Sequence, residues 1–228
     1  MTILSSFWKM LLWGGAIVLA IWVLYGRTQM RRIARDNEHL EQQLGTTKLH
    51  DCDIIFQTST SPQSQAIQLA TRSPYSHCGI LYKRVGAWQV LEATSPVVKL
   101  TPLRNWVYRG KGEHFVIKRL HDADSVLTPA AIKRIQAASE PFWRLTYDAQ
   151  FGWSDDRMYC SELVWKVYDR GLHRRIGRLQ QLKDFDLSNP AVKAKLTERY
   201  GNNLPLDETV ISPVSIFNSP ELVTVLSR

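Results

Sequence analysis

Residues 76–93 read SHCGILYKRVGAWQVLEA, and this stretch predicts the centre of the fold. Two apolar runs, 76–82 and 87–93, flank a short loop that contains glycine, which is typical of a β-hairpin. If the last residue of the first run faces the first residue of the second, paired residue numbers sum to 169. His77 then lies directly opposite Glu92, and the two side chains share one face of the hairpin. A slip of one residue would separate them.

A second stretch, residues 159–168 (YCSELVWKVY), predicts a buried helix. Its apolar residues recur at i, i+1, i+4 and i+5 from Leu163, which is the spacing of one helix face. Cys160 therefore lies in the first helical turn, where the partial positive charge of the helix end and its free amide groups favour a thiolate.

Cys160, His77 and Glu92 supply the three parts of a cysteine hydrolase site: a nucleophile, a base and a carboxylate that orients the base. Taken singly, each has a plainer interpretation. A cysteine on an apolar helix is usually a small core residue, and a strand histidine is often half-buried and satisfied. Glu92 interrupts an apolar run, which is costly unless it has a partner. We therefore predict that the three side chains meet.

The remaining patterns indicate an α+β domain in which an antiparallel sheet packs on helices. Apolar strand patterns occur at 53–57 and 114–120. Ser61-Pro62 and Thr128-Pro129 each pair a capping residue with a proline suited to the first helical position, so a helix is expected after each. Gly171 is expected to end the helix of Cys160.

Three of these motifs resemble those of NlpC-type cell-wall peptidases, which have a papain-like fold. Residues 159–164 (YCSELV) resemble their D-C-S-G-L-V nucleophile motif, residues 52–56 (CDIIF) their G-D-[LI]-V-F strand, and residues 76–81 (SHCGIL) their H-V-G-I-Y strand. Here the histidine precedes the cysteine, the reverse of the usual order. This order is similar to that of the circularly permuted, YiiX-like branch of bacterial papain-fold amidases, and the resemblance runs from about Asp51 to Tyr168, with 211–225 as a closing segment.

The resemblance implies a permuted papain-like domain with Cys160, His77 and Glu92 as catalytic residues. It also implies that Tyr147 lines the oxyanion site, together with the Cys160 backbone amide, and it places Tyr159 in a substrate-positioning role. Cys52, Tyr159 and Glu162 depart from the family pattern, where a glycine, an acidic residue and a glycine stand. These departures weaken any transfer of peptidoglycan specificity.

The amino-terminal segment differs from the rest of the chain. Residues 7–25 (FWKMLLWGGAIVLAIWVLY) carry one charge and have aromatic residues toward both ends, which predicts a single transmembrane helix. A cleaved signal peptide is the alternative, but no A-x-A-like site follows. We expect a tail at 1–6, a helical stalk at 26–47 and the hydrolase domain at 48–228. The protein would then lie in the inner membrane, and four arginines after the span favour a cytoplasmic domain.

Composition limits the classes of partner. The net charge of +8 suits an anionic lipid surface, and no zinc-finger, RNA-recognition or basic-zipper motif accompanies it, so we expect no nucleic-acid partner. The cysteine count of three fits neither a disulfide framework nor a paired metal site, and no metal or cofactor is expected. Residues 29–44 offer a homodimer contact, with a solvated helix as the alternative.

These observations predict a membrane-anchored thiol hydrolase that cleaves a peptide, acyl or amino-acid amide. Two alternatives stay open at this point. The same fold serves lecithin-retinol-type acyltransferases, so a lipid-directed acyltransferase or thioesterase would use the same residues. A catalytically silent membrane scaffold would keep the fold and have an ordinary thiol at Cys160.

Overall fold

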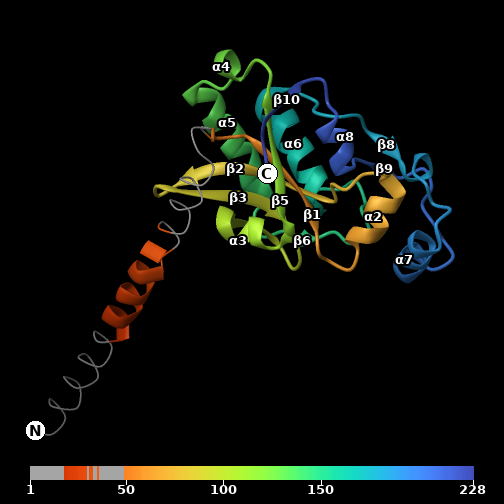
Figure 1. Ribbon diagram of the computed structural model, residues 1–228, viewed down its shortest axis with the longest axis horizontal. Coiled ribbons are helices and arrows are strands. Elements are labelled where there is room, and N and C mark those ends of the chain that lie inside the picture. The colour runs from red at the N-terminus through yellow and green to blue at the C-terminus, as the bar shows by residue number, and fades with distance from the viewer. Residues whose placement is uncertain (1–17, 30, 33–34, 36–48) are drawn as a thin grey trace, which may run out of the picture. The chain divides into compact units, whose positions relative to one another are not determined.

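The computed structural model describes residues 18–29, 31–32, 35 and 49–228 (Figure 1). The chain divides into two compact units, Met1–Gly45 and Thr46–Arg228. In chain order, the elements of the second unit are β1 (Ile54–Ser59), α2 (Ser64–Thr71), β2 (His77–Arg84), β3 (Ala87–Ala93), β4 (Val98–Pro102), α3 (Leu103–Tyr108), β5 (Gly110–Leu120), α4 (Ala123–Val126), α5 (Pro129–Ser139), η1 (Glu140–Phe142), β6 (Thr146–Tyr147), β7 (Arg157–Met158), α6 (Cys160–Leu172), β8 (Gln180–Gln181), η2 (Leu182–Asp184), α7 (Pro190–Tyr200), β9 (Thr209–Val210), α8 (Pro213–Phe217) and β10 (Leu222–Ser227).

The structure contradicts the predicted inner-membrane, single-pass localisation and, with it, the cytoplasmic orientation of the domain. Among the described residues, no helix is both long enough and apolar enough to cross a membrane. Residues 7–17 of the predicted span, and most of the predicted stalk and dimer contact, lie outside the described residues.

A six-stranded antiparallel sheet organises the second unit, with the order β10-β5-β1-β2-β3-β4. The predicted strands at 53–57 and 114–120 are β1 and β5, which lie side by side at the centre of the sheet. The last strand, β10, pairs with β5, so the carboxyl-terminal segment closes the sheet at one edge (Figure 1). The mixed α+β fold with an antiparallel sheet packed on helices agrees with the sequence prediction.

The predicted hairpin forms, but its register differs by two residues from the predicted one. Arg84 pairs with Ala87, so paired numbers sum to 171 and the loop is the two-residue turn Val85-Gly86. Both turn residues have positive φ (51° and 79°), as a type I′ turn requires. The prediction failed because the sequence does not show that valine accepts this conformation at an exposed turn. Since the shift is even, every side chain keeps its face of the sheet.

Helix α6 packs against β2, β3, α5 and α8. The predicted cap of α5 is confirmed: the Thr128 hydroxyl accepts a hydrogen bond from the Ala131 amide (3.2 Å), and proline follows the cap. The prediction that Gly171 ends α6 is wrong, because the helix continues to Leu172. A Cβ atom at Gly171 would lie 2.7 Å from the Ile135 Cα, so this glycine instead allows α5 and α6 to approach closely.

Candidate active site

Cys160 is the first residue of α6, and its side chain is 4% exposed. The preceding residue, Tyr159, has an extended backbone and makes no capping bond to the helix through its side chain. The first amide groups of α6 therefore point toward the space beside the thiol, and the helix dipole favours negative charge there. The Tyr159 hydroxyl accepts a hydrogen bond from the Ile211 amide (3.0 Å), which ties the segment before the nucleophile to the carboxyl-terminal part of the domain.

His77 begins β2, and its Nε2 lies 2.6 Å from a carboxylate oxygen of Glu92 on β3. In the observed register the two residues are diagonal neighbours on one face rather than directly opposed, because Glu92 lies beside Gly79. A Cβ atom at position 79 would lie 3.5 Å from the Glu92 Cβ and only 2.7 Å from the Leu91 carbonyl oxygen. The glycine therefore leaves room for this diagonal contact. The imidazole also stacks on Trp106, with ring centroids 5.7 Å apart.

Glu92 is fully buried and has two partners besides His77. Its Oε1 accepts hydrogen bonds from the Thr101 hydroxyl and from Arg109 Nη2, both at 2.5 Å. Burial alone would raise the pKa of this carboxyl, but His77, Arg109 and Thr101 together lower it below its ordinary value. Glu92 is thus a fixed anion that holds the imidazole ring in one orientation.

Thr101 and Arg109 did not emerge from the sequence. They lie at the end of β4 and just before β5, on segments that reach Glu92 only through the tertiary fold. The one available signal was the cost of burying a carboxylate in the run VLEA, which implied a partner without identifying it.

The Cys160 thiol and the His77 imidazole shift each other's pKa in opposite directions. A hydrogen bond from the Cys78 side chain lowers the pKa of Cys160, burial opposes this effect, and the contact with His77 lowers the pKa further, to well below the ordinary value. Burial lowers the pKa of His77, but its contacts with Cys160 and then Glu92 outweigh burial and raise it to about 10. Both shifts favour thiolate and imidazolium. Because Nε2 faces Glu92, Nδ1 is the ring nitrogen available to Cys160.

Cys78 follows His77 in β2, is buried, and belongs to the same apolar cluster as Cys160. Its contact with the Cys160 thiol is new, since no sequence pattern indicated it. Cys78 and His77 therefore both contact the Cys160 thiol.

Tyr147 reaches the same region from β6. Burial, and next to it the negative charge of Cys160, raise the pKa of its hydroxyl, so this group remains protonated. Gln63 Nε2 donates a hydrogen bond to the hydroxyl oxygen (2.5 Å), and Arg199 Nη2 donates to Gln63 Oε1 (2.6 Å). Arg199 has no acceptor, so its contact fixes which end of the Gln63 amide faces Tyr147. With its oxygen accepting from Gln63, the Tyr147 hydroxyl proton is available to a group beside Cys160.

The other four predicted site residues thus differ in how closely they approach Cys160. His77 contacts Cys160 directly, Glu92 contacts His77, and Tyr147 lies near enough for the Cys160 charge to shift its pKa. Tyr159 adjoins Cys160 in the chain, but its hydroxyl is used by a backbone amide.

Comparison with known proteins places the chain among relatives of the same type. Residues 48–226 match the model of a family described as permuted papain-like amidase enzymes, YaeF/YiiX. A relative recorded as the uncharacterized protein YiiX of Escherichia coli (strain K12) is 49% identical over 173 residues, which cover 76% of this chain and 84% of the relative. A crystal structure titled metalloprotein YiiX, from Escherichia coli O157:H7, superposes with a TM-score of 0.75 at 47% identity and covers 78% of this chain and 97% of that one. The suspected family is confirmed, and the chain belongs to the permuted papain-like amidases of the YaeF/YiiX family.

Proposed function

We propose that this protein is a thiol hydrolase that cleaves an amide bond through a thioacyl-enzyme on Cys160. The observation that carries the proposal is the arrangement of His77, which is bonded to the buried anion Glu92 through Nε2 and contacts the Cys160 thiol at a helix amino terminus. Membership in a papain-like amidase family supports hydrolysis by a cysteine. The roles of the individual side chains are our proposal.

In the first half-reaction, the Cys160 thiolate attacks the carbonyl carbon of the amide. The negative charge that develops on the carbonyl oxygen is stabilised by the Cys160 backbone amide and by the Tyr147 hydroxyl. His77 then transfers its proton to the leaving amine, the C–N bond breaks, and a thioester remains on Cys160. Glu92 keeps the imidazole ring in the orientation that this transfer requires.

In the second half-reaction, a water molecule attacks the thioester carbonyl and His77 accepts its proton. The C–S bond breaks, the carboxylic acid leaves, and Cys160 returns to the thiolate. If an alcohol or amine takes the place of water, the same site performs acyl transfer. An apolar cavity with Cys160 in its lining favours this second function, an acyltransferase or thioesterase that acts on lipid acyl groups.

The crystallised relative is titled a metalloprotein, which raises the question of a metal site in this chain. Among the described residues, no group of three or more His, Cys, Asp or Glu side chains is placed to hold a metal ion. In the acidic and thiol-rich segment 50–53, Asp53 instead pairs with Arg119 (2.7 Å). The steps above therefore use only side chains of this chain.

The proposal is tested by trapping the acyl-enzyme. The protein is mixed with p-nitrophenyl butanoate, p-nitrophenol release is followed in the first turnover, and the acylated residue is located by peptide mass mapping. We expect a burst of one equivalent of p-nitrophenol and a butanoyl group on Cys160. In a separate assay, the protein should also hydrolyse the corresponding amide, butanoyl p-nitroanilide. Cys160→Ala should abolish both signals.

Cys52→Ala is the matched control, because Cys52 is also a buried cysteine and has a pKa raised by burial and then by Asp51 and Asp53. It should keep the burst and the adduct. An adduct on another residue, or an equal burst in Cys160→Ala, would contradict the proposal. Adding glycinamide then separates the two candidate functions, since an acyltransferase gives more amide than acid.

A further inference from the structure

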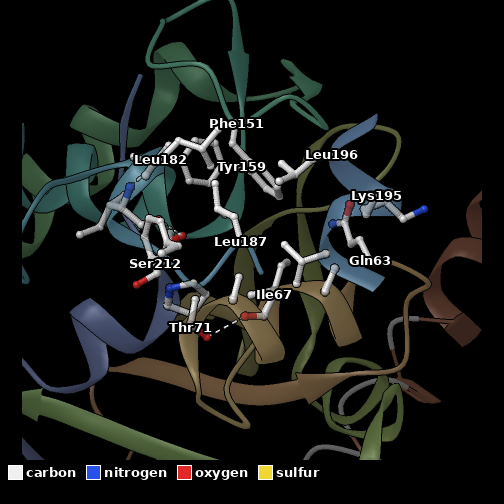
Figure 2. A pocket seen from close by; sticks show the side chains of 18 of the residues that line it. Gln63, Ile67, Thr71, Phe151, Tyr159, Leu182, Leu187, Lys195, Leu196 and Ser212 are labelled. Carbon is white, nitrogen blue, oxygen red and sulfur yellow. Dashed lines mark hydrogen bonds between the residues drawn. The ribbon is translucent and has the colours of Figure 1, made fainter. Parts of the chain in front are cut away.

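A cavity of about 100 Å³ has Cys160 among its lining residues and runs between α2, α7 and the segments 182–187 and 210–213 (Figure 2). It exists because the second unit contains a small apolar cluster separate from the main core. Leu182, Val192 and Leu196 form this cluster, with α2 residues packed against them. The space between the two clusters is therefore enclosed by apolar groups rather than filled by them.

The side chains that face this cavity are mainly hydrocarbon. Figure 2 shows Ile67, Leu187 and Leu196 pointing into it from three different segments. Lys195 contributes the carbon part of its side chain, while its nitrogen points away and pairs with Glu198 (2.5 Å).

The polar side chains along the cavity already have partners within the protein. Gln63 and Arg199 bond to each other. The remaining hydroxyl groups bond to backbone atoms: Thr71 to the Ile67 carbonyl (2.7 Å), Ser161 to the Ile211 carbonyl (2.7 Å), and Ser212 to the Ser215 amide (3.2 Å). A peptide backbone buried here would lose its hydrogen bonds to water without replacement, whereas a hydrocarbon chain would lose nothing.

The position of the cavity relative to the nucleophile identifies which part of a substrate it would hold. A leaving amine must lie beside His77 to receive its proton, and His77 is not among the residues that line the cavity. Gln63, which bonds to the proposed oxyanion donor Tyr147, does line it. The cavity therefore extends from the acyl side of the scissile bond.

We infer that this cavity binds an uncharged, straight acyl chain whose carbonyl carbon lies at Cys160, so that the substrates are acyl amides. This inference rests on the proposed function, for which it names the substrate class. A cavity of about 150 Å³ holds benzene, so by proportion this one has room for roughly four carbon atoms. Chains of medium length thus fit it better than acetyl groups.

The experiment measures kcat/KM for acyl p-nitroanilides from acetyl to decanoyl. Each buried methylene group contributes about a fourfold gain, so hexanoyl should exceed acetyl by about two-hundredfold, and longer chains should level off. Ala66→Phe, on the cavity side of α2, should reduce this ratio to below tenfold. Gln65→Phe is the matched control. It puts the same new side chain on the preceding residue, which is exposed, and should leave the hexanoyl-to-acetyl ratio unchanged.

A second series varies the alkyl group of the amine while the acyl group stays acetyl. Equal gains from the amine side, or turnover that is indifferent to acyl length in the wild type, would overturn the inference and leave the proposed function intact.

Calorimetry on Cys160→Ala with acetamide, butanamide and hexanamide tests binding without catalysis. Affinity that rises with chain length, and is lost in Cys160→Ala/Ala66→Phe, supports the cavity even if no amide is cleaved; affinity without that trend contradicts it.

Discussion

Removing His77 should convert Cys160 from a reactive thiolate into a far less acidic thiol. In the wild type, the pKa of Cys160 lies well below its ordinary value because Cys78 and His77 both stabilise the charged form against burial. In His77→Ala, only Cys78 and the helix end oppose burial, so the pKa moves up toward the value of about 8.5 for a free thiol. A thiol with a pKa of about 8.5 is only about 3% thiolate at pH 7, and the lowered pKa of wild-type Cys160 favours a larger thiolate fraction.

The assay is the rate of Cys160 alkylation by iodoacetamide between pH 4 and 10, with peptide mapping to locate the label. The inflection is more informative than the rate at one pH, because a more basic thiolate is also intrinsically more nucleophilic and this partly offsets its lower abundance. The wild-type profile should rise at low pH. It should change again near pH 10, where His77 loses its proton and the thiolate loses its partner.

His114→Ala serves as the control, since His114 is exposed on β5 and should leave the profile unchanged. Two results would refute the reasoning. One is a wild-type inflection near 8.5, which would mean that Cys160 is an ordinary thiol. The other is a low inflection that persists in His77→Ala, which would mean that the helix end and Cys78 suffice without the imidazole.

Three further perturbations test other contacts. Tyr147→Phe removes one oxyanion donor and should lower kcat by roughly 10²–10³-fold with little change in KM or in the alkylation profile; a change in KM alone would contradict the assigned role. Arg109→Ala should reduce stability in urea titrations by about 1 kcal/mol, since its side chain is 41% exposed and solvent screens the pair, and should raise the alkylation inflection slightly, with Arg109→Lys restoring part of both. Burial raises the pKa of Glu162 from 4.5 to about 7 against the opposing pull of Lys166, so wild-type stability should fall by roughly 3 kcal/mol as the pH rises from about 4.5 to about 7. Glu162→Gln should abolish that fall, because glutamine does not titrate. Lys166 keeps its bonds to Ser154 and Asp155 in this variant. An unchanged pH dependence would show that another group titrates.

Local patterns in the sequence were sufficient to predict several parts of this protein. Thr128-Pro129 marked the start of α5, since a capping hydroxyl and a proline act within one turn. The apolar spacing after Cys160 predicted α6 and put the thiol at its amino terminus. The alternation of the hairpin placed His77 and Glu92 on one face, and this survived a register error because the shift of two residues preserves the side-chain period.

Other features depend on segments that are distant in the chain. Arg109 and Thr101 reach Glu92, and Arg199 orients Gln63 across 136 residues, only after the sheet and helices have assembled. The predicted localisation is contradicted, because no helix among the described residues is long and apolar enough to cross a membrane.

The sequence by itself determined the secondary structure around Cys160 and the family, because both are carried by short motifs whose residues lie close together in the chain. Only the tertiary structure decided the protonation of Cys160 and His77, the partners of Glu92 and the apolar cavity beside the thiol. Burial and charge at a site are set by whichever groups the whole fold brings within a few ångströms, and no local pattern encodes those distances.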